Sequence, residues 1–273
     1  MSRLAFRPAL LGSVATVLAA LAAAPAAQAV PVTFAQFSEA GRSGVGQNFV
    51  FTRSANGANA TLNTANTRDG DDVFFSFMGY ANLPEPLRGA QAAHLKINGG
   101  AGARTTTAVV SNATPSVGTL LSQPFNQTIT FSFTRDTPYV PTFGTLKGRS
   151  LTNLLTVTLG PLRGTNPVLS GFAGTGALSG TFDNELVSLN FASDFLDFSR
   201  VVDRNAALSF SAVVPGLVRS GNFLRAFSAD ATGTFASDPP AALLVGLPVP
   251  EPASVALFGM GLLGLALARR RAA

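Results

Sequence analysis

The chain of 273 residues contains no cysteine, no tryptophan and a single histidine, His94. The missing cysteines exclude disulfide bonds, thiol nucleophiles and every metal site built on cysteine. One histidine is too few for a histidine-rich zinc or iron centre. The fold must therefore be stabilised by apolar burial and backbone hydrogen bonds alone.

Charged residues are also scarce, at 12% of the chain, and the formal net charge is +5. The positive excess lies at the two ends, in Arg3, Arg7 and the run from Arg269 to Arg271. Between Val30 and Pro248 there are 14 Lys and Arg residues against 13 Asp and Glu residues. A nucleic-acid partner would need a basic cluster on this nearly neutral body, and none is present, so we expect no nucleic acid.

The N-terminus has the three parts of a secretory signal peptide. Arg3 and Arg7 form a positive region, Ala9 to Ala24 form an apolar region, and Ala27-Gln28-Ala29 is a signal-peptidase site. We predict that residues 1–29 are a signal peptide that directs the chain through the general secretory translocon. Signal peptidase then recognises Ala27 and Ala29 and cleaves after Ala29.

Residues 248–273 combine three features. Pro250-Glu251-Pro252 holds the backbone extended, an apolar stretch of 16 residues follows, and Arg269, Arg270 and Arg271 come next. As a helix the apolar stretch is about 24 Å long, which is short for a hydrocarbon core of about 30 Å. The arginines would remain cytoplasmic. We predict a single transmembrane helix that anchors the chain in the inner membrane only transiently.

This C-terminal arrangement resembles the PEP-CTERM sorting signal of exported bacterial proteins. The resemblance implies that exosortase processes the chain at or near Pro250 to Pro252 and that the body reaches the cell surface or the extracellular space. Proteins with this tag are associated with bacteria that make exopolysaccharide and form biofilm, which makes exopolysaccharide a candidate partner. A plain tail anchor is the alternative interpretation.

Residues 30–247 alternate between apolar and hydroxyl-bearing side chains, with the period of a half-buried β-strand. The clearest segments are Thr128–Thr134, Leu155–Leu159, Val187–Phe191 and Leu208–Ala212. Val73 to Tyr80 is apolar on both faces and predicts a central strand. Only Pro84 to Ala93 has a helical pattern, and Thr137-Pro138 has the composition of a turn.

The fold class predicted for this body is all-β, as an antiparallel β-sandwich of jelly-roll or immunoglobulin-like type with about ten short strands. A β-solenoid is the competing architecture. It would need a fixed repeat of about 20 to 50 residues, which the sequence lacks.

Three groups of residues are candidate sites in the body. A calcium ion could be bound by the carboxylate oxygens of Asp69, Asp71 and Asp72. We favour the other interpretation, in which these residues form an Asp-Gly turn before the strand at Val73. A glycosidase needs a pair of carboxylates, and the candidates are Asp183, Glu185, Asp194 and Asp197. We favour the interpretation that these four are ordinary solvated carboxylates. His94 has no nucleophile partner in the sequence, so we expect a surface or edge histidine.

These features favour a non-enzymatic protein of the cell surface or extracellular matrix, without a cofactor or metal. The alternative is a secreted carbohydrate-binding module or hydrolase with a loop calcium site. Aromatic platforms for sugar rings are scarce, because the chain has no tryptophan and only Tyr80 and Tyr139, and we interpret its 22 phenylalanines as core.

Overall fold

The computed structural model describes residues 30–40, 47–53, 60–65, 70–81, 83–97, 108–109, 114–115, 120–142, 144–221 and 223–243. The predicted signal peptide at 1–29 and the sorting segment at 248–273 lie outside these described residues, so their boundaries stay predictions. Among the described residues, no helix is long and apolar enough to cross a membrane.

Strands dominate the described part of the chain. They are β1 (Val32–Glu39), β2 (Phe49–Arg53), β3 (Ala60–Thr64), β4 (Asp71–Phe77), β5 (Ala90–Ile97), β6 (Ala108–Val109), β7 (Thr114–Pro115), β8 (Leu120–Pro124), β9 (Ile129–Tyr139), β10 (Leu151–Gly160), β11 (Val168–Phe172), β12 (Leu178–Asp183), β13 (Ser188–Ala192), β14 (Leu196–Asp197), β15 (Arg204–Val214), β16 (Arg219–Ser220), β17 (Phe223–Leu224), β18 (Phe227–Ser237) and β19 (Ala241–Ala242). One 3-10 turn, η1 (Glu85–Leu87), precedes β5. The prediction of an all-β body is confirmed.

Fifteen of the strands formed by the described residues belong to one continuous antiparallel sheet. Its order is β13-β10-β9-β5-β4-β1-β18-β15-β12-β11-β8-β7, with β2, β3 and β6 as a side branch. The branch starts at β18, which pairs with β15 along one edge. On its other edge, residues 233–237 pair with β1 and residues 227–229 pair with β2. The sheet therefore forks between β1 and β2.

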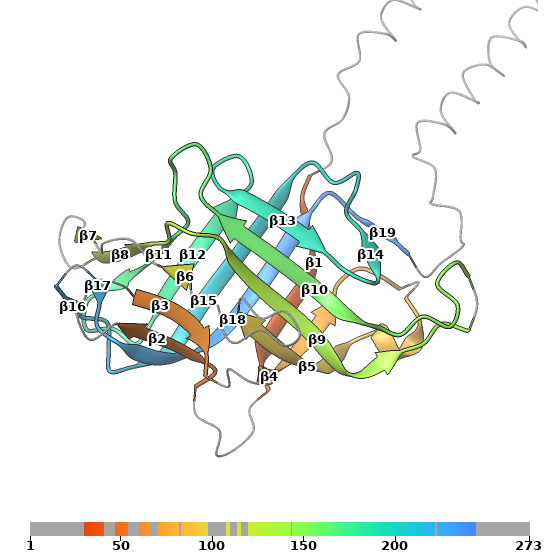
Figure 1. Ribbon diagram of the computed structural model, residues 1–273, viewed down its shortest axis with the longest axis horizontal. Coiled ribbons are helices and arrows are strands. Elements are labelled where there is room, and N and C mark those ends of the chain that lie inside the picture. The colour runs from red at the N-terminus through yellow and green to blue at the C-terminus, as the bar shows by residue number, and fades with distance from the viewer. Residues whose placement is uncertain are drawn as a thin grey trace, which may run out of the picture. The chain divides into compact units, whose positions relative to one another are not determined.

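The sheet curls so that β9, β10 and β13 cross the inner face of β1 and β18 (Figure 1). Phenylalanine rings join the two parts. The ring centroids of Phe34 on β1 and Phe191 on β13 are 5.2 Å apart, and those of Phe133 on β9 and Phe235 on β18 are 5.7 Å apart. Both pairs have the edge-to-face geometry that aromatic rings prefer. One curled sheet thus encloses the core, whereas the jelly-roll or immunoglobulin-like assignment stays a prediction.

The alternating pattern correctly predicted which side chains enter this core. The alternating residues of β9 and β10 are at most 2% exposed: Ile129, Phe131, Phe133, Leu155, Val157 and Leu159. The threonine and serine residues between them lie on the outer face of the sheet. Leu154 is buried as well, where the pairing of β10 with β9 shifts register. Burial of one face of each strand is the main favourable term in the folding of such a body.

The prediction of a central strand at Val73 to Tyr80 is confirmed, although one of its two apolar faces is partly exposed. β4 does pair on both edges, with β1 and β5, and Val73, Phe75 and Phe77 are buried. Phe74 is 43% exposed and Met78 is 39% exposed. These two side chains lie on the outer face of the sheet, which is open to solvent at this place.

Two local predictions are wrong because tertiary pairing overrides local propensity. The helical pattern at Pro84 to Ala93 yields only η1, and Ala90 already begins β5, where Gln91 and Ala93 are buried against the core. The expected turn at Thr137-Pro138 lies inside β9, in an irregular stretch of its pairing with β10. There the missing N–H of Pro138 interrupts no regular ladder.

Candidate functional site

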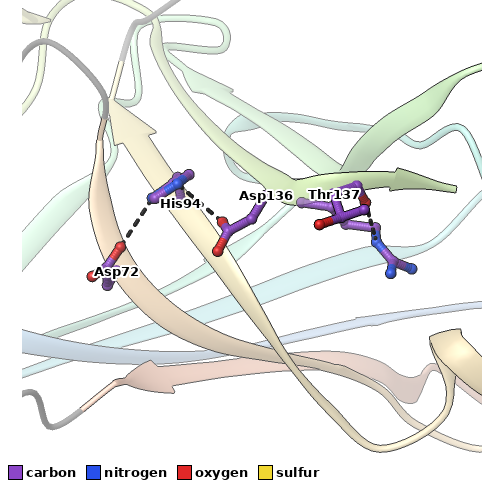
Figure 2. Close-up of polar contacts among 5 residues, drawn as sticks. Asp72, His94, Asp136 and Thr137 are labelled. Carbon is purple, nitrogen blue, oxygen red and sulfur yellow. Dashed lines mark hydrogen bonds and ion pairs between the residues drawn. The ribbon is translucent and has the colours of Figure 1, made fainter.

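The single histidine of the chain lies between two aspartates on the outer face of the sheet, as Figure 2 shows. His94 on β5 stands opposite Asp72 on β4. The distance from His94 Nδ1 to Asp72 Oδ1 is 3.0 Å, and from His94 Nε2 to Asp136 Oδ1 it is 2.9 Å. Asp136 follows Arg135, whose Nε donates a hydrogen bond to the Thr137 carbonyl. The sequence did not reveal this trio, because strand register alone brings it together.

The His94 trio links strands, and its arrangement is not that of a serine triad. A serine triad needs a hydroxyl on one ring nitrogen, whereas both nitrogens of His94 face aspartate oxygens. These contacts link β4, β5 and β9 through one side chain from each strand. His94 is one-third exposed on a strand that pairs on both edges, so it is a surface histidine and not an edge histidine.

Two of the three aspartates considered for calcium are described by the structure, and these two do not converge. Asp71 is 3% exposed and points toward the core, whereas Asp72 points outward to His94. Neighbouring strand residues alternate between faces, so these two carboxylates cannot share an ion. Asp69 lies outside the described residues. Within the described ranges, no group of three or more His, Asp or Glu side chains is placed to hold a metal ion.

Three of the four carboxylates considered as a glycosidase pair accept hydrogen bonds from the backbone, and the fourth, that of Glu185, is exposed in a turn. Asp194 Oδ2 accepts hydrogen bonds from the N–H groups of Thr152 and Asn153, at 2.9 and 2.8 Å. Asp183 Oδ1 accepts a hydrogen bond from the N–H of Glu185 at 2.7 Å. Each of these contacts fixes a turn or the start of a strand, which is the role of a structural carboxylate.

Asp197 also serves the backbone. Its Oδ1 accepts a hydrogen bond from the N–H of Ser199 at 2.9 Å, and the hydrogen bonds with Ser199 lower the pKa of Asp197. A glycosidase general acid needs a raised pKa, so Asp197 is shifted in the wrong direction for that role.

The structure forms one carboxylate pair that the sequence did not predict. Glu39, at the end of β1, is hydrogen-bonded to Asp230 of β18, where the sheet forks. Burial raises the pKa of Glu39, and so do the nearby charges of Asp230 and Asp71. No signal in the sequence marks this pair, because its members lie at opposite ends of the body.

A hollow of about 460 Å³ lies on the outer face of four neighbouring strands, β1, β18, β15 and β12. Three consecutive residues of each strand line it, namely residues 36–38, 232–234, 207–209 and 179–181. The middle residue of each triplet faces the core, and the outer two face solvent. We call this surface the hydroxyl hollow.

Strand register arranges the outward side chains of the hydroxyl hollow in two rows. The first row consists of Ser179, Ser209 and Thr232 and is continued by Ser38, which follows Phe37, the last β1 residue paired with β18. The second row consists of Thr181, Ala207, Thr234 and Gln36. Seven of these eight side chains carry a hydroxyl or an amide, and none carries a charge. The sequence showed hydroxyl-rich strand faces, but only the register reveals that they align.

Glycine forms part of the floor of the hydroxyl hollow. A Cβ added to Gly233 would lie 2.5 Å from the Phe37 ring, and one added to Gly180 would lie 2.6 Å from the Phe182 ring. The core beneath these positions therefore has no room for a side chain. Close packing from below supports the floor, so the hollow is backed by the rigid core.

Comparison with known proteins adds information at the C-terminus. Residues 248–271 match the family model of the PEP-CTERM protein-sorting motif. No curated protein and no solved structure is similar enough to the chain to count as a match. The matched segment contains the predicted motif residues, all of which lie outside the described residues: Pro250, Glu251, Pro252, Arg269, Arg270 and Arg271. The chain thus carries the PEP-CTERM protein-sorting motif, which implies an exported, membrane-transiting protein that exosortase sorts.

Proposed function

We propose that the protein is a non-enzymatic component of the cell surface or extracellular matrix whose body associates with exopolysaccharide. The general secretory translocon exports the chain, signal peptidase removes residues 1–29, and the C-terminal segment holds it in the inner membrane until exosortase acts at or near Pro250 to Pro252. The observation that carries the proposal is the hydroxyl hollow on an exported, nearly neutral body. Hydroxyl side chains both donate and accept hydrogen bonds, as sugars do.

The placement of the acidic side chains supports binding rather than hydrolysis. The carboxylates of Asp183, Asp194 and Asp197 accept backbone hydrogen bonds, and both nitrogens of His94 face carboxylates. A glycosidase needs two carboxyl groups free to protonate and attack a sugar on either side of its ring. We therefore expect the body to retain polysaccharide without cleaving it.

The decisive experiment compares the host with and without its exosortase, by cell fractionation and intact mass. We expect a species that lacks the residues after about Pro252 to appear in the matrix fraction only when exosortase is present. A variant in which Pro250 and Pro252 are both alanine is the matched control, and it should stay in the membrane fraction. A full-length chain in the membrane of both strains would overturn the sorting part of the proposal.

A second measurement tests the non-enzymatic part. The purified protein is incubated with matrix polysaccharide, with either calcium or a chelator, and reducing ends are counted. We expect none to form, and we expect the melting temperature to be the same in calcium and in chelator. New reducing ends or stabilisation by calcium would instead favour the alternative of a secreted hydrolase or carbohydrate-binding module with a calcium site.

A further inference from the structure

We propose that the hydroxyl hollow binds a single strand of an uncharged polysaccharide, which lies across β1, β18, β15 and β12 along the two rows. This inference rests on the proposed function and names both the site and the class of ligand.

The first argument is the regular spacing of the hydroxyl groups. Neighbouring strands lie about 4.8 Å apart, so the first row presents a hydrogen-bonding group at that interval along a line, and the second row does so except at Ala207. The first row continues beyond the hollow, because Ser170 on β11 pairs with Ser179 and Ser122 on β8 pairs with Ser170. The Oγ atoms of Ser122 and Ser170 are 2.8 Å apart. A periodic line of this length fits a polymer better than a small molecule.

The second argument is the absence of charge among the lining residues. An acidic polymer would have to give up water around its anionic groups without a cation to replace it, which is costly. Protein partners prefer surfaces with aromatic and arginine anchors, and the hydroxyl hollow has neither among its outward side chains. Small apolar ligands prefer mostly apolar pockets. A neutral polysaccharide is rich in hydroxyls and needs neither a cation, nor aromatic and arginine anchors, nor a mostly apolar pocket.

The third argument is an exposed ring at the edge of the hollow. Phe74 on β4 stands directly opposite Ser38, the last member of the first row, and is 43% exposed on the outer face. Sugar rings have an apolar face of C–H groups, and a flat aromatic ring offers a surface to cover it. From Ser122 to Phe74 the line crosses seven strands and measures about 29 Å, at about 4.8 Å a step.

The test uses the full chain, purified in mild detergent, and the host's own matrix polysaccharide, separated into neutral and acidic fractions by anion exchange. We expect the wild-type chain to bind the neutral fraction. The variant T232V/T234V keeps the shape and strand preference of both side chains but removes two hydroxyls. Each hydrogen bond contributes about 1 kcal/mol net, so binding should weaken about tenfold or more.

The matched control is T156V/T158V on β10, with the same spacing on one outer face but outside the hydroxyl hollow. It should bind like the wild type, although it also removes the 3.0 Å hydrogen bond from Thr156 Oγ1 to Asn153 Oδ1. T232V/T234V should keep the wild-type melting temperature. Two further variants test the site independently of hydroxyls. Ala207→Phe places a ring in the second row and should abolish binding. Phe74→Ala should weaken binding several-fold, whereas Leu186→Ala, at a turn residue that is 64% exposed, should not.

The outcomes separate this inference from the proposed function. If the chain binds polysaccharide but T232V/T234V and A207F bind as well as the wild type, the site is wrong and the proposed function stands. If the chain binds the acidic fraction and not the neutral one, the ligand class is wrong. If it binds neither fraction, both the site and the polysaccharide part of the proposed function fail.

Discussion

At the scale of single residues, Gly70 shows how one backbone position controls the start of a central strand. It has a φ of +89°, a conformation that side chains with a Cβ rarely adopt. An added Cβ would also lie 2.7 Å from the Leu95 carbonyl oxygen on β5. Gly89 has a similar φ of +76°, but nothing lies within 4 Å of its added Cβ. Comparing an alanine substitution at Gly70 with one at Gly89 therefore distinguishes the cost of backbone strain from the cost of steric collision.

We expect Gly70→Ala to lower the free energy of unfolding by about 2 to 4 kcal/mol, the sum of left-handed strain and overpacking. Gly89→Ala carries only the strain and should cost about 1 to 2 kcal/mol. Urea unfolding of both variants measures the difference. Equal losses would show that β5 moves away from Gly70 without cost.

At the scale of elements, hydrogen bonds from backbone N–H groups to carboxylates hold the connections between strands. Asp194 lies in the segment between β13 and β14, and its side chain bonds to two N–H groups at the start of β10. Its own N–H donates to the Asn153 carbonyl at 3.0 Å. These contacts dock the segment onto β10. They also bring Phe195 into the core near the ring of Phe77, and Phe198 near the ring of Phe34.

We expect Asp194→Ala to destabilise the protein by about 2 to 3 kcal/mol, because it removes hydrogen bonds from two N–H groups to a charged acceptor. Glu185→Ala, which truncates an exposed carboxylate in a nearby turn, is the control and should change stability by less than about 0.5 kcal/mol. Thermal unfolding followed by circular dichroism would detect the difference. Similar stability of the two variants would remove the structural role assigned to Asp194.

At the scale of the whole molecule, the fork of the sheet brings together acids that are remote in the chain. Glu39 and Asp230 are hydrogen-bonded there, and the pKa of Glu39 is raised by burial, by Asp230 and by Asp71. The folded state therefore holds a proton on Glu39 at a pH where the unfolded chain has released it. As pH rises above 4.5, the ordinary pKa of this carboxyl, the protein loses stability through Glu39.

We expect Glu39→Gln to remove this pH-dependent loss. Its melting temperature should equal that of the wild type at acidic pH and should exceed it increasingly as pH rises above 4.5. Melting curves of both proteins between about pH 4 and pH 8 test this. A constant difference across that range would show that Glu39 does not titrate differently in the folded and unfolded states.

Local pattern was enough to predict the inward faces of β9, β10, β13 and β15, since alternation is a property of neighbouring residues. It was not enough for the phenylalanines. All described phenylalanines are buried except Phe74 and Phe172, and the sequence contains nothing that separates these two from the rest. Their exposure depends on whether another part of the curled sheet covers that face.

The sequence by itself determined the sorting motif at residues 248–271 and the all-β class, because both depend on short linear patterns. Strand register, the fork at β18 and the curl of the sheet were decided by the tertiary structure. They align Ser179, Ser209 and Thr232 in one row and place His94 between Asp72 and Asp136. The physical reason is that cross-strand neighbours are set by pairing and core packing between distant segments, which no local pattern encodes.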